Sequence, residues 1–308
     1  MLSVAICTYN GARFIREQIA SILGQTVPVD EIVVCDDCST DDTLEIVESM
    51  KTKANVLFRV FRNEENVGFK ENFFNAIERC NGDLVFLADQ DDVWHPDKVE
   101  TIVNWFEGHP DKQVVFTDAS LIDDRGIAIE GSLWERFGFD SKKQRFFNHG
   151  CALDIWMWSN RATGATMAVR KSFVEKGWRA FSDKYHDEVI ALQGIASHAM
   201  GYISQRLMDY RLHDDQVCGA AETPLELQYT PLKPCPELSL GSCFDALPVK
   251  ERQHVEFVLK RAMPKKTRFG WDPITNLCSY VRIYRAWAFM FFIYDLGVFV
   301  KHSFRKRS

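Results

Sequence analysis

The sequence predicts an α/β fold in which a mostly parallel sheet is flanked by helices, with a helical extension at the C-terminal end. Short apolar runs alternate with helical patterns through the first ~120 residues, which is typical of a parallel sheet covered on both faces. Polar clusters follow three of these runs, at the edge where such sheets bind ligands. The chain has 308 residues, 46% of them hydrophobic, which is enough for a large core.

Five strands are predicted in the first part of the chain because each is a short apolar run. They cover residues 2–8, 31–35, 56–61, 83–88 and 114–117. Helices are predicted between them, at 15–23, around 44–47, at 69–80 and at 96–105. Ser39 or Thr40 is the expected N-cap of the second helix, and Pro96 is placed where the fourth should begin.

The pattern is less regular after Asp118. The segment LIDDRG predicts a hairpin turn, residues 163–169 and 202–210 are expected to be strands, and residues 186–198 a helix. Residues 219–248 contain five prolines and predict a linker or a wrapping segment. We therefore expect one domain over residues 1–218, in two parts (1–118 and 119–218), then the linker 219–248, and a basic, aromatic-rich extension over residues 249–308.

Charge is distributed unevenly along the chain. Residues 260–308 hold eleven Lys or Arg and two Asp, a net charge of +9 on a protein whose total is −6. Within this part, residues 286–300 are apolar except for Asp295, but the stretch is shorter than the ~20 residues that span a bilayer. It is expected either to lie on an anionic membrane surface or to pack on the catalytic domain or a dimer partner.

The N-terminal sequence MLSVAICTYN has no secretory pattern, so a cytoplasmic location is expected, with the inner face of the plasma membrane as the membrane contact. The nine cysteines are scattered and are expected to be reduced thiols. Cys35 and Cys38 form a C-x-x-C pair, but no second pair has the spacing of a zinc site. No nucleic-acid partner is expected.

Three polar clusters follow predicted strands: residues 8–10, residues 36–37, and the carboxylates in FLADQDDVW. The carboxyl ends of parallel strands meet at one edge of a sheet, so these clusters are expected to converge. Asp89 and Asp91 are two residues apart, a good arrangement for Mg²⁺ or Mn²⁺, which bind a few carboxylates together with phosphate oxygens and water. Alternatively, Asp91 or Asp92 only caps the next helix.

Eight segments resemble, in order and spacing, the family-2 glycosyltransferases of the GT-A fold, and most closely a bacterial branch labelled rhamnosyltransferase-like. They are VAICTYNG, VVCDDCSTDDT, NVGFKENFFNAI, DLVFLADQDDVWHPDK, FTDASLIDDRG, RATGATMAVR, HDEVIAL and YRLHDDQ. The resemblance covers about residues 2–217. It implies a transferase that uses a nucleotide sugar and acts in surface polysaccharide synthesis.

The resemblance also implies which residues hold the nucleotide sugar. Thr8, Tyr9 and Asn10 would line the nucleotide site, and Asp36 or Asp37 would hydrogen-bond the base. The loop beside the nucleotide would be shaped by Asn66, Gly68 and Lys70. Asp89 and Gln90 would contact the sugar or ribose, and Asp91, with Asp89, would bind Mn²⁺ or Mg²⁺ through its DXD pattern. His213 would add a metal or phosphate contact, or is a surface histidine.

Asp187 matches the family's catalytic base, which takes the proton of the acceptor hydroxyl in an inverting transfer. The family commonly has aromatic residues after His-Asp, whereas Glu188 and Val189 follow here. Glu188 could therefore share the role of base. Alternatively, His186 and Asp187 only begin a helix, where Asp is favoured.

Two further segments have alternative interpretations. Trp156 and Trp158 could stack on sugar rings, although core packing is favoured because Trp is usually buried. The small residues of TGATM, from Thr163 to Met167, could let the backbone approach the donor sugar, or form a tight bend in a strand.

Three classes of function are compatible with a nucleotide-sugar site. The favoured one is a non-processive hexosyl- or deoxyhexosyltransferase that uses a UDP- or dTDP-linked sugar and a saccharide or lipid-linked acceptor, since the Q-x-x-R-W signature of processive relatives is absent. A sugar-phosphate nucleotidyltransferase should carry a Gly-rich phosphate loop, which TYNGARF matches poorly. A non-catalytic nucleotide-sugar-binding protein would not need both Asp91 and Asp187.

Overall fold

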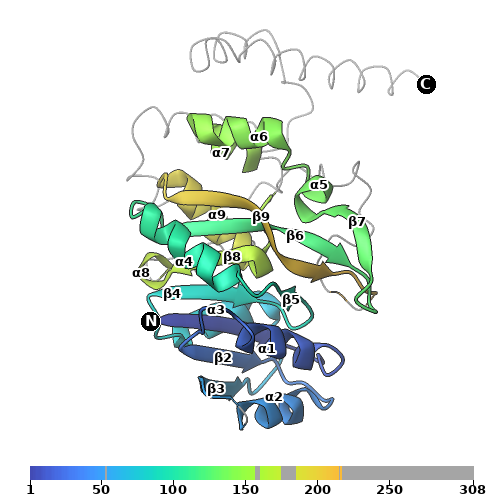
Figure 1. Cartoon of the computed structure of the whole chain (residues 1–308). Helices are drawn as coiled ribbons and strands as arrows, with labels where there is room; N and C mark the ends of the chain where they lie inside the picture. The colour runs from blue at the N-terminus through green and yellow to red at the C-terminus, as the bar shows by residue number, and fades with distance from the viewer. Residues whose placement is uncertain (53, 157–159, 175–184, 215, 217–308) are drawn as a thin grey trace, which may run out of the picture. The chain divides into compact units, whose positions relative to one another are not determined.

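The computed structural model describes residues 1–52, 54–156, 160–174, 185–214 and 216. In this part of the chain, nine strands form one sheet in the order β3-β2-β1-β4-β8-β6-β9-β5, and β7 pairs with β6 (Figure 1). The strands are β1 (Leu2–Thr8), β2 (Glu31–Asp36), β3 (Leu57–Arg62), β4 (Leu84–Ala88), β5 (Val93–Trp94), β6 (Val114–Ile122), β7 (Ala128–Ser132), β8 (Met167–Arg170) and β9 (Met200–Arg211).

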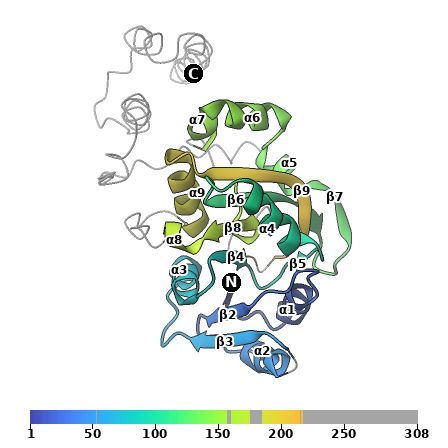
Figure 2. The same ribbon diagram turned by 60° about the vertical axis from the view of Figure 1, so that its left-hand side comes forward.

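Helices cover both faces of the sheet (Figures 1 and 2). They are α1 (Ile15–Leu23), α2 (Thr43–Lys51), α3 (Phe69–Arg79), α4 (Lys98–Gly108), α5 (Leu133–Phe137), α6 (Ser141–Phe146), α7 (Ala152–Trp156), α8 (Lys171–Val174) and α9 (His186–Ala196). Two shorter helical segments are η1 (Phe147–Cys151), which is kinked at Gly150, and η2 (Gly164–Thr166).

Two apolar cores lie on opposite faces of the sheet because side chains alternate along each strand. On β1, Val4 and Ile6 belong to one core, and Ala5 and Cys7 to the other. The first core is covered by α1, α2 and α4, and the second by α3 and α9. These apolar stripes are the ones that the sequence pattern predicts for the first four strands and their helices.

The first part of the sheet is parallel, as predicted. β1 pairs in parallel with β2 and β4, and β2 pairs in parallel with β3. The cap predicted for α2 is wrong, because that helix begins at Thr43 after Asp42. The Ser39 hydroxyl donates to the buried Asp36 carboxylate instead. A hydrogen bond to this buried group therefore replaces the local capping interaction that the sequence favours.

The second part of the sheet is mixed, although parallel residue pairs still predominate in the sheet as a whole. β8 runs antiparallel to both of its neighbours, β4 and β6, whereas β6 and β9 are parallel. The strand predicted over residues 163–169 is shorter, because η2 occupies its first half, with the Thr166 N–H donating to the Thr163 carbonyl at 2.9 Å. The strand β8 begins only at Met167.

The hairpin turn predicted at LIDDRG is confirmed. It joins β6 to β7, with the Asp123 N–H donating to the Ile127 carbonyl at 2.9 Å. Gly126 has a φ of +81°, which glycine adopts without the cost that other residues incur.

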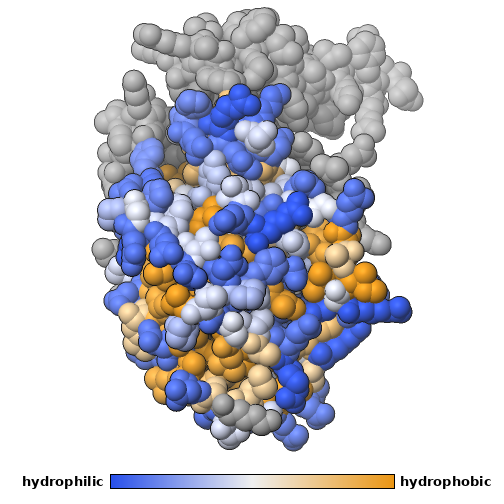
Figure 3. Space-filling model, in the orientation of Figure 1, coloured by the Kyte–Doolittle hydropathy of each residue, from blue (hydrophilic) through white to orange (hydrophobic). Residues whose placement is uncertain are grey.

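Apolar and hydrophilic residues are interspersed on the face seen in Figure 3. Three of the exposed large apolar residues, Tyr9, Val67 and Tyr185, lie just after β1, just before α3 and just before α9. None of the described helices is long and apolar enough to cross a membrane. The predicted linker 219–248 and extension 249–308 lie outside the described residues.

Candidate active site

The polar clusters after β1 and β4 meet, as predicted, through one amide. The Tyr9 N–H donates to Gln90 Oε1 at 2.8 Å, and Gln90 Nε2 donates back to the Tyr9 carbonyl at 3.1 Å. Gly11 makes this contact possible, since a Cβ there would lie 2.2 Å from Gln90 Oε1. The Gln90 side chain therefore joins the ends of two neighbouring strands.

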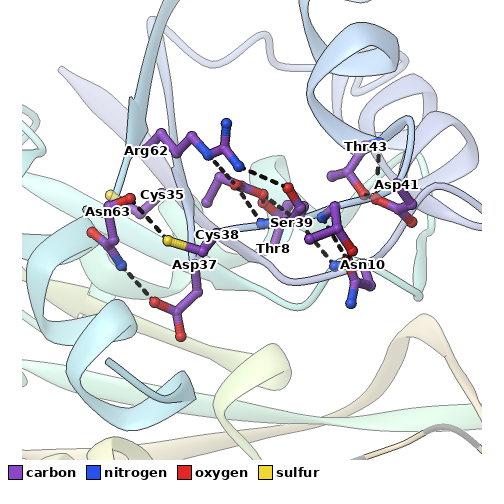
Figure 4. A network of polar contacts seen from close by, with 12 residues as sticks. Thr8, Asn10, Cys35, Asp37, Cys38, Ser39, Asp41, Thr43, Arg62 and Asn63 are labelled. Atoms are coloured by element: carbon purple, nitrogen blue, oxygen red, sulfur yellow. Dashed lines mark hydrogen bonds and ion pairs between the residues drawn. The ribbon is translucent and has the colours of Figure 1, made fainter. Parts of the chain in front are cut away.

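Asp36, at the end of β2, is fully buried and fastens β1 to the following loop. Its carboxylate accepts hydrogen bonds from Thr8 Oγ1 at 2.8 Å and from the Ser39 N–H at 2.9 Å. Arg62 Nη2 donates to the Ser39 carbonyl at 3.0 Å (Figure 4). Thr8 and Asp36 thus satisfy one another inside the protein.

Asn10 connects the loop after β1 to the loop after β2. It has a φ of +49°, a conformation that Asn tolerates better than most residues. Its Oδ1 accepts from the Thr40 N–H at 2.9 Å, and its own N–H donates to Ser39 Oγ at 2.9 Å (Figure 4). Tyr9, beside it, keeps 47% of its surface exposed and is therefore free to meet a ligand.

Asp37 shapes the loop that the sequence predicts beside the nucleotide. Its carboxylate accepts from Asn63 Nδ2 and from the N–H groups of Val67 and Gly68, each at 2.8 Å. The Gly68 N–H also lies 3.1 Å from Asn66 Oδ1, and the φ of Gly68 is +83°. The half-buried Lys70 follows in the first turn of α3.

Both carboxylates proposed to bind the base therefore already accept hydrogen bonds from the protein. Asp36 lies under the loop, whereas Asp37 lies at its edge and holds the Asn63–Gly68 turn. A base contact by either one stays a prediction.

The turn Asp89–Asp92 follows β4 and faces the end of β9. Asp91 Oδ2 lies 2.7 Å from His213 Nε2, and Asp92 Oδ1 accepts from the Arg211 N–H at 3.0 Å. Neither Asp91 nor Asp92 caps the next helix, since α4 begins at Lys98 after Asp97. The capping alternative is therefore wrong, and so is a surface position for His213, whose side chain is 6% exposed.

Asp187 lies in the first turn of α9. Its Oδ1 accepts from the Glu188 N–H at 2.7 Å, and its Oδ2 lies 3.3 Å from the Gly164 nitrogen, which donates to it. Gly164 is small because a Cβ there would lie 2.5 Å from His186 Nε2, so the TGATM segment accommodates this ring. The His186 ring stacks on Phe73 at 3.9 Å, and burial lowers its pKa to about 3, so it is neutral.

The electrostatics place Asp187 near the carboxylate turn. Burial, together with the charges of Asp91 and Asp187, raises the pKa of Asp89 to about 8. Burial also raises the pKa of Asp187 to about 7; the charge of Glu188 adds to the increase, and backbone N–H groups oppose it. The sequence segments DQDD and HDEVIAL thus converge on one crowded group of carboxyls.

This group fits a divalent cation by its chemistry. In the described part of the chain, no three His, Cys, Asp or Glu side chains are gathered as a complete metal site. Asp91 and His213 are paired, however, and Asp92 Oδ2 and His213 Nδ1 are buried without a hydrogen-bond partner among the described residues. Two or three protein ligands suit Mg²⁺ or Mn²⁺ whose other ligands are phosphate oxygens and water.

Sequence reasoning missed two buried basic residues beside the carboxylates, Lys98 and Arg211. Lys98 is fully buried, with its Nζ 2.9 Å from the Ala165 carbonyl and 4.2 Å from the centre of the Trp94 ring. Burial lowers its pKa to about 7, although the charges of Asp92 and Asp89 oppose this shift. A lysine in the first turn of a helix opposes the helix dipole, and this signal could have revealed it.

Trp156 has the packing role that the sequence favours. It is 1% exposed and lies 5.6 Å from Phe116 and 5.7 Å from Phe139, ring centre to ring centre. Trp158 lies outside the described residues. Cys35 and Cys38 are free thiols, as expected, and Cys38 Sγ donates to the Asn63 carbonyl at 3.0 Å.

A parallel half joined to a mixed half, with carboxyls at the strand ends of both, is the arrangement of the GT-A fold. The model of the glycosyl transferase family 2 matches residues 3–177, more than half of the chain. The protein belongs to this family.

Relatives agree with this assignment. An "Uncharacterized glycosyltransferase" of Haemophilus influenzae is 28% identical over 224 residues, which cover 70% of this chain and 67% of that one. A chondroitin synthase of Escherichia coli is 33% identical over 129 residues, 42% of this chain and 18% of that one. The matched part of the chain spans less than half the length of several curated relatives.

A solved structure shows the same fold. TarS of S. aureus (residues 1–349), in complex with UDP-GlcNAc, superposes with a TM-score of 0.52 at 20% identity, covering 70% of this chain and 59% of that one. The rhamnosyltransferase-like branch stays a prediction.

Proposed function

We propose that the protein is an inverting, metal-dependent, non-processive glycosyltransferase. It transfers a hexosyl or deoxyhexosyl group from a UDP- or dTDP-linked sugar to a hydroxyl of a saccharide or lipid-linked saccharide. The observation that carries this proposal is the contact of Asp91 with His213, in the same turn as Asp89, whose pKa the charge of Asp187 helps to raise.

The roles follow from the environments of these residues. Asp187 is the base: it accepts the proton of the acceptor hydroxyl while that oxygen bonds the anomeric carbon and the bond from that carbon to the diphosphate breaks. A pKa of about 7 suits this task, because such a carboxylate is ionised near neutral pH yet basic enough to hold a proton. Its bond from Gly164 fixes its orientation.

Asp91 and His213, with Asp89 beside them, would hold Mn²⁺ or Mg²⁺. The bound ion supplies positive charge for the departing diphosphate. The crowded carboxylates support this assignment, since a cation is the partner that allows several of them to ionise together. The rim from Tyr9 to Asn10 and the Asn66–Lys70 loop would hold the nucleotide.

The donor and the biological role are supported more indirectly. TarS, which shares the fold, was solved with UDP-GlcNAc, so UDP sugars are the first donors to test. The chondroitin synthase is a relative named for polysaccharide synthesis, in keeping with a surface polysaccharide as the product. The proposed cytoplasmic location rests on the N-terminal sequence, and the proposed contact with the inner face of the membrane rests on residues 286–308, outside the described part.

A panel of nucleotide sugars, each with Mn²⁺, tests the proposal. We expect release of the nucleoside diphosphate from one of them, and loss of this release with EDTA. Pyrophosphate formed from a nucleoside triphosphate would instead indicate a nucleotidyltransferase. Binding of a nucleotide sugar without turnover, in the presence of candidate saccharide acceptors, would indicate a non-catalytic binding protein.

Asp91→Ala tests the metal site directly. We expect it to abolish the Mn²⁺ dependence of nucleotide binding, because it removes the carboxylate that pairs with His213. Calorimetry with UDP, dTDP and GDP, with and without Mn²⁺, measures this effect. An unchanged affinity in the presence of Mn²⁺ would disprove the assignment.

A further inference from the structure

Arg211 lies behind the carboxylate turn and contacts two consecutive residues of it. Its backbone N–H donates to Asp92 Oδ1 at 3.0 Å, and its Nε donates to the Asp91 carbonyl at 2.7 Å. Asp91 and Asp92 are thus held by one residue at the end of β9.

The guanidinium is itself fixed from two other segments. Its Nη2 donates to Glu17 Oε2 on α1 at 2.6 Å, and its Nη1 donates to the Asp123 carbonyl in the β6–β7 turn at 3.3 Å. The side chain is 2% exposed, so its position depends on these partners and not on solvent. A planar group with five donors can bond three separate acceptors at once, whereas an ammonium on a flexible stem cannot do so in this geometry.

Phe14 links the Arg211 side chain to His213. The Phe14 ring lies 4.7 Å from the centre of the Arg211 guanidinium and 4.9 Å from the His213 ring. His213 Nε2 in turn lies 2.7 Å from Asp91 Oδ2. Four residues therefore form a ring of contacts. Arg211 bonds the backbone of Asp91, the Asp91 carboxylate contacts His213, and Phe14 packs against both His213 and Arg211.

We propose that Arg211 is the positioning residue of the metal site: it sets the distance and orientation between Asp91 and His213 before the cation binds. This inference rests on the proposed function, because it assumes that the pair holds a divalent cation. Residues that orient metal ligands typically change metal affinity by about 10- to 100-fold when they are replaced.

Mn²⁺ titration followed by electron paramagnetic resonance, alone and with UDP or GDP, tests the proposal on the full chain. Arg211→Lys keeps the positive charge but loses the simultaneous bonds to Asp91, Asp123 and Glu17. We expect it to weaken Mn²⁺ binding by about 10- to 100-fold. Thermal unfolding without metal is measured alongside.

Arg170→Lys is the matched control. Arg170 also bonds backbone carbonyls, those of Lys112 and Phe106, and lies over the Phe106 ring, but at the end of β8. We expect this variant to lose a similar amount of thermal stability while its Mn²⁺ affinity stays that of the wild type. Equal Mn²⁺ affinity in Arg211→Lys and Arg170→Lys would overturn the proposal.

Glu17→Ala keeps the test decisive if Arg211→Lys does not fold. The Glu17 side chain is 58% exposed, so its removal is tolerated, yet it frees one end of the guanidinium. We expect Mn²⁺ binding to weaken by a few-fold, less than a full loss of the orienting residue; unchanged binding would contradict the proposal. A wild-type protein that binds no Mn²⁺, alone or with nucleotide, would instead disprove the metal dependence itself.

Discussion

The two sides of the rim differ in how their charges are satisfied. On the proposed nucleotide side, Asp36 and Asp37 accept several hydrogen bonds each from neighbouring loops. On the proposed reaction side, the pKa of Asp89 is raised to about 8 and that of Asp187 to about 7. Aspartates are thus held by hydrogen bonds in one region and buried near other carboxyls in the other.

This difference separates two uses of aspartate. A carboxylate that accepts several hydrogen bonds from the protein is held in place and gives shape to a loop. A carboxylate that is buried among like charges is unfavourable in its ionised form, and binding of a cation or a proton relieves this repulsion. Asp36 and Asp37 therefore have their hydrogen-bond partners within the protein, whereas Asp89 and Asp187 would gain a partner from the ligands of the proposed function.

Asp187→Asn gives the largest expected effect on this comparison. The amide keeps the size of the side chain but cannot accept a proton, so turnover of the nucleotide sugar should fall by about 10²- to 10⁴-fold. Nucleotide affinity, measured by calorimetry, should stay close to that of the wild type. Both kcat and kcat/KM should fall, as for an interaction made only in the transition state.

Glu188→Gln is the companion variant, because Glu188 is the neighbouring carboxylate. A small effect is expected. Near-normal turnover in Asp187→Asn together with a large loss in Glu188→Gln would identify Glu188 as the base.

The pH dependence of kcat sharpens the same point. Asp187 must be ionised to act as the base, so kcat with saturating Mn²⁺ should fall about tenfold per pH unit below 7 and level off above it. Its folded pKa lies above that of an unfolded chain, so this group favours folding less as pH rises through 7. Asp187→Asn should therefore be at least as stable as the wild type at pH 8, and lower stability there would point to misfolding.

Asp36→Ala tests the region in which aspartates are held by hydrogen bonds. It leaves Thr8 Oγ1 and the Ser39 N–H without their buried partner, so the free energy of unfolding should fall by about 2–4 kcal/mol. Asp42→Asn is the control, because this exposed residue makes no side-chain cap to α2; its effect should stay within about 0.5 kcal/mol. Urea unfolding measures both, and similar losses would contradict the distinction between the two aspartates.

Gly11→Ala and Gln90→Ala give the smallest expected effect. Either change breaks the contact between Gln90 and the Tyr9 backbone, one by displacing the amide and the other by removing it. Each should lower the free energy of unfolding by about 1–2 kcal/mol. Because both remove the same contact, the double variant should lose little more than either single one, and full additivity would show that the two act separately.

The sequence predicts the first half of the fold well because its information there is local. Each strand from β1 to β4 is an apolar run, and each connection is a helix with its own apolar stripe. The second half depends on pairing between distant segments. Nothing local to Met167–Arg170 says that β8 runs antiparallel between β4 and β6.

The same contrast holds for the candidate site. Convergence of the strand ends follows from topology, so the contact between Tyr9 and Gln90 is foreseeable in kind. The partners of Arg211 come from α1 and the β6–β7 turn, and no pattern near position 211 indicates them. Buried polar side chains take their role from the tertiary fold, and sequence periodicity does not report that.

The position of β8 has a consequence for how the chain assembles. All five residues of β4 are buried, and its outer edge is covered only when β8 pairs with it, much later in the chain. During synthesis the β1–β4 unit can form early from local contacts, whereas β8 and β9 must wait for segments far along the chain. A fragment that ends before Met167 would present an unpaired apolar edge strand and is expected to aggregate.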